Sequence, residues 1–307
     1  MRALITGAAG QDGTLLRRLL ARRGVQVLGV LRPGQADADA PSLTDASAVK
    51  KLFDHFAPDI VFHLAAAHHS SEGTTDGALK REMEDTNFRA AELLAETIAE
   101  RRPQCRLLLA GSSQMYSAPD VGELVVSEDT PMAPSTFYGE TKARSREMLG
   151  RLRQRGVFGV TAILFNHESE LRPPQFVTRK ISMAAARAKR GLTTQLHLRD
   201  ITSRTDWSSA HDIVEAMWLA LNAPEPADYV LASGTAHSIQ DVLEVAFGSV
   251  GLDWRTFTTF DPPPPVPRGV LVGDASRAKA TLGWTPKVSF EEMIRDMVRA
   301  DMDALSS

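Results

Sequence analysis

Short apolar runs alternate with longer amphipathic stretches through the first half of the chain. Five apolar runs have the length and composition of buried strands, at positions 2–6, 25–30, 60–64, 106–110 and 160–165. Between them, apolar residues recur every three or four positions, as in amphipathic helices, at positions 15–23, 46–56, 80–101 and 138–155. Buried strands that alternate with helices indicate parallel βαβ units. We therefore predict an α/β fold with a doubly wound parallel sheet.

The pattern becomes less regular after residue 165. Its features are a polar stretch, a helical pattern, a run of prolines and a final helical pattern, at positions 166–175, 177–190, 262–267 and 289–305. The prolines cannot lie inside a helix, whereas Glu291 and Glu292 suit the first turn of the final one. We expect a first domain at 1–165 and a smaller C-terminal α/β lobe at 166–307, with segments that cross between them.

The composition is that of an ordinary globular protein. Of the 307 residues, 43% are hydrophobic and 24% are charged, which excludes a disordered or coiled-coil chain. The formal net charge is -3 without a dense Lys/Arg stripe, so we expect neither nucleic acid nor an anionic membrane as a partner. No apolar run reaches the roughly 20 residues that span a bilayer. The single cysteine, Cys105, and a first strand at the N-terminus without a signal peptide predict a cytoplasmic protein.

A glycine-rich turn joins the first predicted strand to the first predicted helix. The sequence TGAAGQDG places Gly7, Gly10 and Gly13 there, which is the context of a dinucleotide-binding turn. Gly7 permits the tight turn, Gly10 lets the backbone approach a pyrophosphate, and Gly13 allows close packing of the helix. The helix N-terminus supplies N–H donors to the phosphates. We expect a Rossmann-type domain that binds a nicotinamide dinucleotide.

The end of the second predicted strand distinguishes between the two nicotinamide dinucleotides. Arg32 stands there, where an acidic residue would hold the ribose 2′-hydroxyl of NAD. A guanidinium instead suits the 2′-phosphate of NADP. We therefore expect NADP rather than NAD, with a solvated loop cation as the alternative role for Arg32.

A tyrosine and a lysine four residues apart begin the helical pattern at 138–155. Tyr138 and Lys142 would lie on one face of that helix. The lysine ammonium should lower the pKa of the phenol, which could then exchange a proton with a sugar hydroxyl while hydride moves to the nicotinamide. Ser112, at the end of a predicted strand, could hold the reacting oxygen. A half-buried helix aromatic is the structural alternative for Tyr138.

Together, these residues resemble the catalytic set of the extended short-chain dehydrogenases. Three further stretches resemble those of GDP-mannose 4,6-dehydratases, namely NHESELRPPQFVTRKI, TDWSSAHDIVEAMWLAL and GDASRAKATLGWTPKVSFEEMIRDMVRADM, at 166–181, 205–221 and 273–302. The resemblance covers nearly the whole chain. It is closer than the resemblance to the GDP-4-keto-6-deoxymannose reductases, a sister group within the same superfamily of nucleotide-sugar enzymes.

The resemblance implies functions for individual residues. It implies that the cofactor is bound by Gly7, Gly10, Gln11, Asp12, Gly13, Arg32, Leu64, Ala65, Ala66, Asn87, Tyr138 and Lys142. It implies that a GDP-sugar is bound in the smaller substrate-binding lobe and at its border by Ser113, Asn166, Arg172, Val177, Thr178, Lys180, Arg204 and Arg268, with Arg179 as a further candidate. A polar loop followed by cations suits a diphosphate. Arg179 and Lys180 would otherwise form a solvated helix face.

One departure from the family concerns the chemistry. Where the dehydratases have a glutamate that removes the C5 proton, this chain has Gln114. A neutral amide is not a general base near pH 7, so dehydration would need another base. Ser112, Tyr138 and Lys142, which hydride transfer at C4 requires, are retained. This set is also expected of a 4-keto reductase or a C4 epimerase.

Further departures concern the phosphate pocket. The arginine expected before the Asp-Trp pair is Thr205, with Arg204 beside it. Another expected arginine falls near Pro264, with Arg268 downstream. Binding of the diphosphate is therefore expected to be rearranged.

The cofactor pocket departs from the family as well. The aspartate that usually contacts adenine falls at Ser42, and the usual glutamine after the third strand is Ala67, followed by His68 and His69. No Asp, Glu or Cys stands at metal-ligand spacing from these histidines. We interpret them as polar contacts at the strand end rather than acid/base groups or ligands, and we predict no metal site.

The loop after the second predicted strand bears on assembly. In the dehydratases a longer loop, rich in arginine and serine, bridges neighbouring subunits, and here it is shortened to RPGQADADAPS. We therefore expect a homodimer rather than a tetramer, formed through the helices predicted at 80–101 and 138–155.

The leading hypothesis is an NADP-dependent nucleotide-sugar enzyme, similar to GDP-mannose 4,6-dehydratases, that acts at C4 of a GDP-hexose. A GDP-4-keto-6-deoxy-hexose reductase or epimerase is the first alternative, because of Gln114. A catalytically inactive relative that binds dinucleotide and regulates a partner is the second, because of the displaced arginines. The sequence leaves the identity of the sugar and of the base open.

Overall fold

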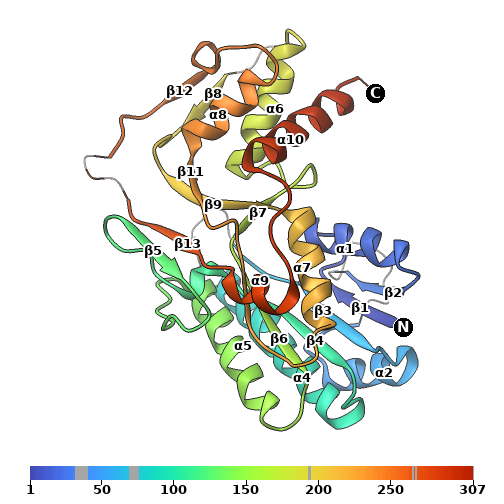
Figure 1. The fold of residues 1–307 in the computed structure, drawn as a ribbon. Helices are drawn as coiled ribbons and strands as arrows, with labels where there is room; N and C mark the ends of the chain where they lie inside the picture. The colour runs from blue at the N-terminus through green and yellow to red at the C-terminus, as the bar shows by residue number, and fades with distance from the viewer. Residues whose placement is uncertain (32–40, 69–75, 193–194, 265, 267, 307) are drawn as a thin grey trace.

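A computed structural model describes the chain apart from residues 32–40, 69–75, 193–194, 265, 267 and 307 (Figure 1). Six strands form one sheet with the order β10-β6-β4-β3-β1-β2, and neighbouring strands run parallel. Their bounds are β1 (Arg2–Thr6), β2 (Gln26–Val30), β3 (Ile60–His63), β4 (Arg106–Ala110), β6 (Gly159–Leu164) and β10 (Tyr229–Leu231). The predicted α/β fold is confirmed, and the five apolar runs of the first half supply five of these strands.

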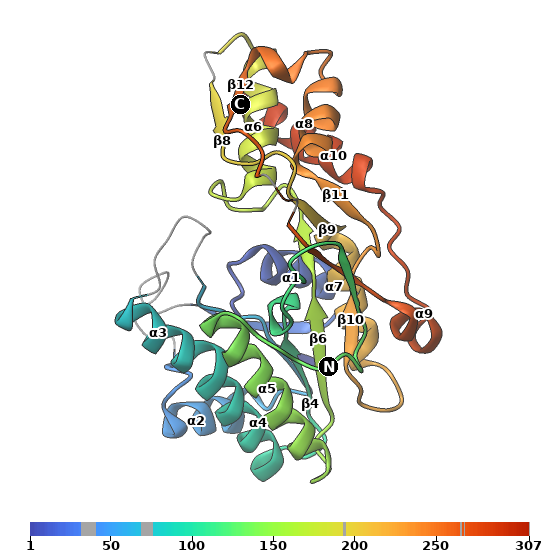
Figure 2. The same cartoon turned by 90° about the vertical axis from the view of Figure 1, so that its left-hand side faces the viewer.

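Helices cover both faces of the sheet, as in a doubly wound fold. One face is packed by α1 (Gln11–Arg22) and α7 (Ala210–Leu221), whose buried aliphatic side chains meet the strands. The other face is packed by α2 (Ala46–Phe56), α4 (Ala90–Arg101) and α5 (Phe137–Arg153), which lie side by side in Figure 2. Among the residues described, no helix combines the length and the apolar character needed to cross a bilayer.

The helical pattern predicted at 80–101 is not one regular helix. It consists of α3 (Gly77–Met83), a π-helical segment (Glu84–Arg89) and α4. The π-helical segment carries Asn87, which is only 1% exposed. Such wider turns inside a helix frequently occur at functional sites.

A smaller lobe continues from the carboxyl end of β6 (Figure 1). Its elements are α6 (Val177–Lys189), α8 (Ile239–Gly248), α10 (Phe290–Ala304), the sheet β11-β9-β7 (Ala236–Ser238, Arg204–Ser209, Asn166–Glu168) and the pair β8-β12 (Leu196–Leu198, Thr258–Phe260). The three helices share a core with Trp207 and Phe247. The helical patterns at 177–190 and 289–305 therefore correspond to α6 and α10.

Segments cross between the two halves of the sequence. From the second half, β10 completes the main sheet and α7 packs on it. From the first half, β5 (Glu123–Val126) pairs in parallel with β13 (Val270–Gly273). The short helices η2 (Ser113–Met115) and η3 (Trp254–Thr256) and the helix α9 (Ser276–Leu282) complete the described elements. The division of the chain after residue 165 stays a prediction.

A buried aspartate joins several of these segments. Asp206 of β9 is 1% exposed and accepts hydrogen bonds of 2.9 to 3.0 Å from the backbone N–H groups of Ser233, Gly234 and Gly273. A buried carboxylate needs such donors to offset its loss of hydration. This aspartate, which belongs to a stretch that carries the family resemblance, therefore has a structural role.

Candidate active site

The candidate site lies where the strand order of the main sheet reverses. β1 lies between β2 and β3, so the chain leads from β1 to β2 on one side and then to β3 on the other side. In such sheets, ligands bind beyond the carboxyl ends of the strands at this point. Thr6 ends β1 and His63 ends β3, and Thr6 Oγ1 lies 2.8 Å from His63 Nδ1. This buried hydrogen bond fixes the ends of β1 and β3 relative to each other.

His63 is a neutral structural residue. Its Nε2 lies 3.2 Å from the carbonyl oxygen of Thr86 and donates to it, so Nδ1 accepts from the Thr6 hydroxyl. Burial lowers the pKa of His63 to about 3, and the nearby ammonium of Lys142 acts in the same direction. The Thr6 oxygen also accepts from Ala65 N at 3.2 Å, which fixes the backbone after β3.

The glycine turn has the geometry of a phosphate-binding turn. Gly7 adopts φ +71°, and a Cβ there would lie 2.8 Å from Ala65 N. A Cβ at Gly13 would lie 2.3 Å from Gly7 O. Gly10 differs, because it is exposed and a Cβ there would lie 3.3 Å from Gly7 O. The fold therefore requires Gly7 and Gly13, whereas Gly10 leaves room for a ligand at the N-terminus of α1.

The side chains of Gln11 and Asp12 face β7 and the residues after it. Gln11 donates from Nε2 to His167 O at 3.1 Å and accepts at Oε1 from Ser169 Oγ at 2.9 Å. Asp12 Oδ2 lies 2.9 Å from His167 Nε2. Burial opposes ionisation of both groups, yet their mutual attraction puts the pKa of Asp12 below and that of His167 above the usual value. These side chains join the glycine turn to the smaller lobe.

Asn87 holds the backbone of the residues after β3 in place through hydrogen bonds. Its Oδ1 accepts from Ala67 N at 2.8 Å, and its Nδ2 donates to Ala67 O at 3.0 Å and to Thr141 Oγ1 at 3.2 Å. The amide is therefore engaged with the protein and closed to solvent. Asn87 therefore positions the backbone after β3, where Leu64, Ala65 and Ala66 are partly exposed.

Two residues singled out in the sequence lie outside the described residues. These are Arg32, on which the choice of NADP depends, and His69. The preference for NADP over NAD therefore stays a prediction.

Ser112, Tyr138 and Lys142 come together at the carboxyl end of β4. The Tyr138 hydroxyl is hydrogen-bonded with Ser112, and Lys142 Nζ lies 5.7 Å from the centre of the Tyr138 ring. Lys142 is 2% exposed and donates from Nζ to Ala110 O at 2.8 Å. Thr136 caps α5 by accepting from Gly139 N at 3.0 Å, which fixes the turn that carries the tyrosine.

The expected lowering of the tyrosine pKa is wrong in this structure. Burial raises the pKa of Tyr138 to about 12, against the opposing effects of the Ser112 hydrogen bond and the charge of Arg172. Burial also lowers the pKa of Lys142 to about 8. Because the ammonium donates to Ala110 O, loss of hydration outweighs its attraction for a phenolate.

Gln114 lies at the N-terminus of α5, beside the tyrosine. Its side chain is exposed, and its Oε1 accepts from Thr136 Oγ1 at 3.2 Å. Its backbone packs closely on the helix, because a Cβ at Gly139 would lie 2.1 Å from Gln114 O. Ser113 is partly exposed next to it. The amide of Gln114 can orient a ligand but cannot take its proton.

Arg172 approaches the site from the loop before α6. Its Nε lies 3.1 Å from Glu168 Oε2, and its guanidinium lies 3.6 Å above the ring of Phe176. The same carboxylate oxygen accepts from Thr178 Oγ1 at 2.7 Å. Burial raises the pKa of Glu168 above its usual value, although Arg172 opposes this shift. Glu168 therefore holds Arg172 in place, and Thr178 faces the protein rather than an open pocket.

The other predicted substrate residues lie on the smaller lobe. Asn166 is exposed at the start of β7, and Val177 and Lys180 are partly exposed in the first turn of α6. Arg179, in contrast, pairs with Asp301 of α10 at 2.6 Å and braces the two helices. The first three positions can meet a ligand held between the lobes.

The two displaced arginines lie near the β5-β13 pair. Arg204 Nη1 lies 2.5 Å from Glu123 Oε1, and its Nη2 donates to Ala236 O at 2.9 Å. Arg268 is exposed just before β13. Arg204 therefore joins strands of both halves, so its guanidinium has a structural partner.

His68 follows β3 at the mouth of the site and is exposed. Its ring centre lies 6.1 Å from that of Tyr138, with an interplanar angle of 76°, and 5.8 Å from that of Phe176. Among the described residues, no group of three His, Cys, Asp or Glu side chains is placed to hold a metal ion.

Sequence reasoning did not single out His63, His167 or Glu168. His63 ends a buried strand, and nothing in its neighbours distinguishes it from a core residue. His167 and Glu168 lie in β7, which begins two residues after the end of the buried strand β6. Two titratable residues just beyond a buried strand are the signal that could have found them.

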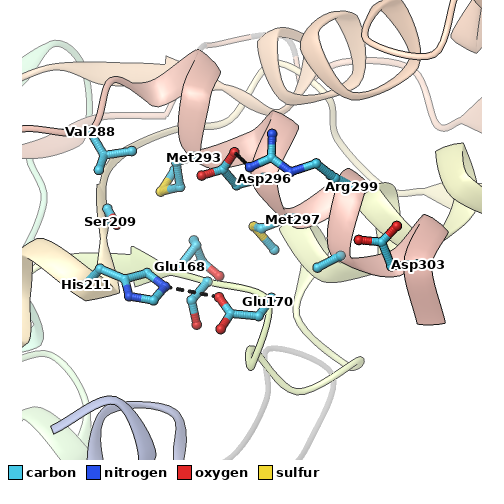
Figure 3. A pocket seen from close by; sticks show the side chains of 12 residues that line it. Glu168, Glu170, Ser209, His211, Val288, Met293, Asp296, Met297, Arg299 and Asp303 are labelled. Carbon is cyan, nitrogen blue, oxygen red and sulfur yellow. Dashed lines mark hydrogen bonds and ion pairs between the residues drawn. The ribbon is translucent and has the colours of Figure 1, made fainter. Parts of the chain in front are cut away.

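A cavity of about 390 Å³ lies between β7, the start of α7 and α10 (Figure 3). Its walls carry Glu170 and His211, whose Oε2 and Nε2 atoms are 3.1 Å apart, and the apolar side chains of Met293 and Met297. None of the predicted catalytic residues lines it. Glu168, which pairs with Arg172, also lines it, so the cavity adjoins the candidate active site.

Comparison with known proteins places the chain among sugar-nucleotide enzymes. A family model described as GDP-mannose 4,6 dehydratase matches residues 4–297. GDP-mannose 4,6 dehydratase 2 of Arabidopsis thaliana is 34% identical over 326 residues, which cover 98% of this chain and 87% of that protein. The human GDP-mannose 4,6 dehydratase is 30% identical over 357 residues, which cover 99% of this chain and 92% of that protein.

Solved structures share the fold at lower identity. The UDP-glucose 4-epimerase of Thermus thermophilus, in complex with NAD, has a TM-score of 0.80 and 24% identity, covering 99% of this chain and 100% of that one. RMD from Pseudomonas aeruginosa, in complex with NADPH, has a TM-score of 0.81 and 20% identity, covering 99% of both chains. These proteins hold NAD in one case and NADPH in the other, so a nicotinamide dinucleotide is common to both.

Proposed function

Because the chain belongs to the GDP-mannose 4,6-dehydratase family, we propose that it is an NADP-dependent enzyme that acts at C4 of a GDP-hexose. It is an enzyme of the extended short-chain dehydrogenase type. The observation that carries the proposal is the assembly of Ser112, Tyr138 and Lys142 at the carboxyl end of β4, next to the glycine turn.

The residues present fit a dinucleotide at the edge formed by β1 and β3. The N-terminus of α1 offers N–H groups to a pyrophosphate, and Gly10, whose own N–H donates to Gly7 O at 3.0 Å, has no side chain to keep it away. Ala65 and Ala66 present a small, partly exposed surface beside it. When bound, the nicotinamide accepts a hydride and can return it.

The proposed substrate spans from this edge to the smaller lobe. Asn166, Val177 and Lys180 would contact the GDP moiety, and Arg172 would face its phosphates or the sugar. Arg172 is pre-oriented by Glu168 and by the ring of Phe176, so little freedom is lost when it binds an anion.

Tyr138 would take the proton of the C4 hydroxyl as hydride leaves C4. Ser112, which is hydrogen-bonded with the phenol, would hold the same sugar oxygen. Since burial raises the pKa of Tyr138 to about 12, the phenol needs an acceptor for its own proton. Lys142, whose pKa is lowered to about 8, can exchange protons near neutral pH and sits on the same helix face.

Gln114 favours a second candidate function. A reductase or epimerase acts at C4 without removing the C5 proton, so the exposed amide of Gln114 would be compatible with it. In that case a 4-keto-6-deoxy sugar would consume NADPH stoichiometrically, whereas a dehydratase recycles its cofactor.

The test is incubation of the protein with GDP-mannose and a catalytic amount of NADP⁺, followed by mass spectrometry and nicotinamide absorbance. Loss of one water without net cofactor consumption is expected for the dehydratase. Absence of water loss, together with NADPH oxidation by a GDP-4-keto-6-deoxy sugar, would assign the reductase. Absence of both reactions would support the inactive, regulatory alternative.

A further inference from the structure

His68 lies beside the tyrosine of the candidate active site and has no part in the hydride transfer proposed above. Its ring meets Tyr138 edge-on, with centres 6.1 Å apart, and lies 5.8 Å from the ring of Phe176. These contacts place the imidazole between α5 and the segment that leads into α6. His68 is exposed, so a ligand in the site can reach it.

The other ionisable groups around the tyrosine are poor candidates for a base. Asp12 is paired with His167 at 2.9 Å. Lys142 is the proposed proton partner of Tyr138 and donates to the carbonyl oxygen of Ala110 at 2.8 Å, and Arg172 is a permanent cation. An imidazole, in contrast, can accept a proton near neutral pH and release it again. The chemistry of the surroundings therefore favours His68.

The separation of the two rings suits groups that act on neighbouring carbon atoms. Tyr138 would act on the oxygen at C4, and C5 is bonded directly to C4. A general base must come within hydrogen-bond reach of the proton that it removes. With ring centres 6.1 Å apart, both rings lie close enough together to contact one hexose.

We propose that His68 is the general base that removes the C5 proton of the 4-keto sugar and delivers it to the departing C6 hydroxyl. The inference rests on the proposed function, because oxidation at C4 makes the C5 proton acidic. The C5–H electron pair becomes the second bond between C5 and C6 as the C6–O bond breaks, and the oxygen leaves as water. The hydride taken from C4 then returns to C6, and C5 takes a proton from solvent.

The experiment compares the full-length wild type with His68→Asn and with His55→Asn, a control at an exposed histidine of α2. Each protein is mixed with GDP-mannose and NADP⁺ in D2O, and nicotinamide absorbance, loss of water and deuterium at C5 are followed. The wild type and the control are expected to lose water and to carry deuterium at C5. His68→Asn should still reduce the nicotinamide but lose water about 100-fold more slowly.

Several outcomes would overturn the role of His68. If His68→Asn loses water at the wild-type rate, His68 is not the base, and the proposed hydride transfer at C4 is unaffected. If the wild type reduces the nicotinamide but never loses water, the role of His68 is overturned as well. A wild type that neither reduces NADP⁺ nor loses water contradicts the proposed function, and the role of His68 with it. His68→Gln is measured in parallel, with thermal unfolding as the check of folding.

Discussion

At the scale of single residues, burial sets the protonation states of the site. It raises the pKa of Tyr138 and lowers those of Lys142 and His63. Tyr138 and His63 are therefore neutral near pH 7, and Lys142 loses its proton more readily than an exposed lysine, for the same physical reason, loss of hydration. The proposed hydride transfer at C4 therefore depends on how the tyrosine gives up its proton.

Replacing the tyrosine tests this dependence. Tyr138→Phe keeps the ring beside Lys142 but removes the hydroxyl that is hydrogen-bonded with Ser112. We expect nicotinamide reduction by a GDP-hexose to fall by about 100- to 10,000-fold, far more than the affinity for the dinucleotide. The two quantities are measured by stopped-flow absorbance and by fluorescence titration. A variant with wild-type reduction would remove Tyr138 from the mechanism.

His63 makes the fold sensitive to acid. Its pKa is lowered from 6.5 to about 3, so below pH 6.5 the unfolded chain binds a proton that the folded chain excludes. Its contribution to stability is complete above pH 6.5 and is lost as the pH falls toward 3, by about 3 kcal/mol between pH 7.5 and 4.5.

The measurement is the free energy of unfolding by urea at these two pH values for the wild type, His63→Gln and the surface control His55→Gln. We expect His63→Gln to lose less stability on acidification than the other two proteins. An equal loss in all three would show that His63 is not responsible.

Part of the residue chemistry could be predicted from the sequence. The spacing of Tyr138 and Lys142 put both on one helix face, and the contact with Ser112 follows from strand ends that meet at one edge. The direction in which the pKa of Tyr138 is shifted could not be predicted, because it depends on burial and on the carbonyl oxygen that binds Lys142. Neither is encoded in local spacing.

At the scale of elements, the turn between β1 and α1 separates two roles of glycine. Gly13 is required by packing, since a Cβ would lie 2.3 Å from Gly7 O, whereas Gly10 is exposed and has more room. The same turn is joined to the smaller lobe by Gln11 and Asp12. The proposed binding of the cofactor and the placement of the smaller lobe therefore depend on the same turn.

Alanine substitutions distinguish these roles. Gly13→Ala should destabilise the fold by more than 1 kcal/mol through the clash with Gly7 O, roughly as overpacking does elsewhere. Gly10→Ala should change stability little but weaken dinucleotide binding. Gly150→Ala in α5, where a Cβ meets no atom within 4 Å, is the control and should stabilise by about 1 kcal/mol. Equal dinucleotide affinity of Gly10→Ala and wild type would contradict the assignment.

The periodicity of apolar residues predicted where helices and strands lie more readily than it predicted their exact geometry. The apolar runs predicted five strands of the main sheet to within a residue or two, because buried parallel strands are continuously apolar, but they did not predict β5. The π-helical segment at Glu84–Arg89 was missed, since its apolar spacing matches that of a helix. The segment carries the buried amide of Asn87, which bonds to residues 20 and 54 positions away.

At the scale of the whole molecule, we expect a homodimer through the helices on the second face of the sheet. α4 and α5 lie side by side on that face (Figure 2). Sedimentation or light scattering should give about 67 kDa, twice the chain mass of 33.4 kDa. A stable tetramer or a monomer at micromolar concentration would contradict this prediction.

The arrangement of the two lobes could be predicted only in outline. The change of pattern after residue 165 located the smaller lobe, but the pairing of β5 with β13 joins strands about 150 residues apart. The contact between His68 and Phe176, from segments on either side of the site, is likewise a tertiary one. Such long-range contacts leave no periodic signal in a single sequence.

The most direct test of hydride transfer at C4 uses GDP-mannose labelled with deuterium at C4 and a catalytic amount of unlabelled NADP⁺. We expect the label to leave C4 in the wild type, passing through the nicotinamide to C6 as one water is lost. Tyr138→Phe should leave the label in place. Product or substrate recovered from the wild type with all of its deuterium still at C4, and no label in the nicotinamide, would contradict the central claim.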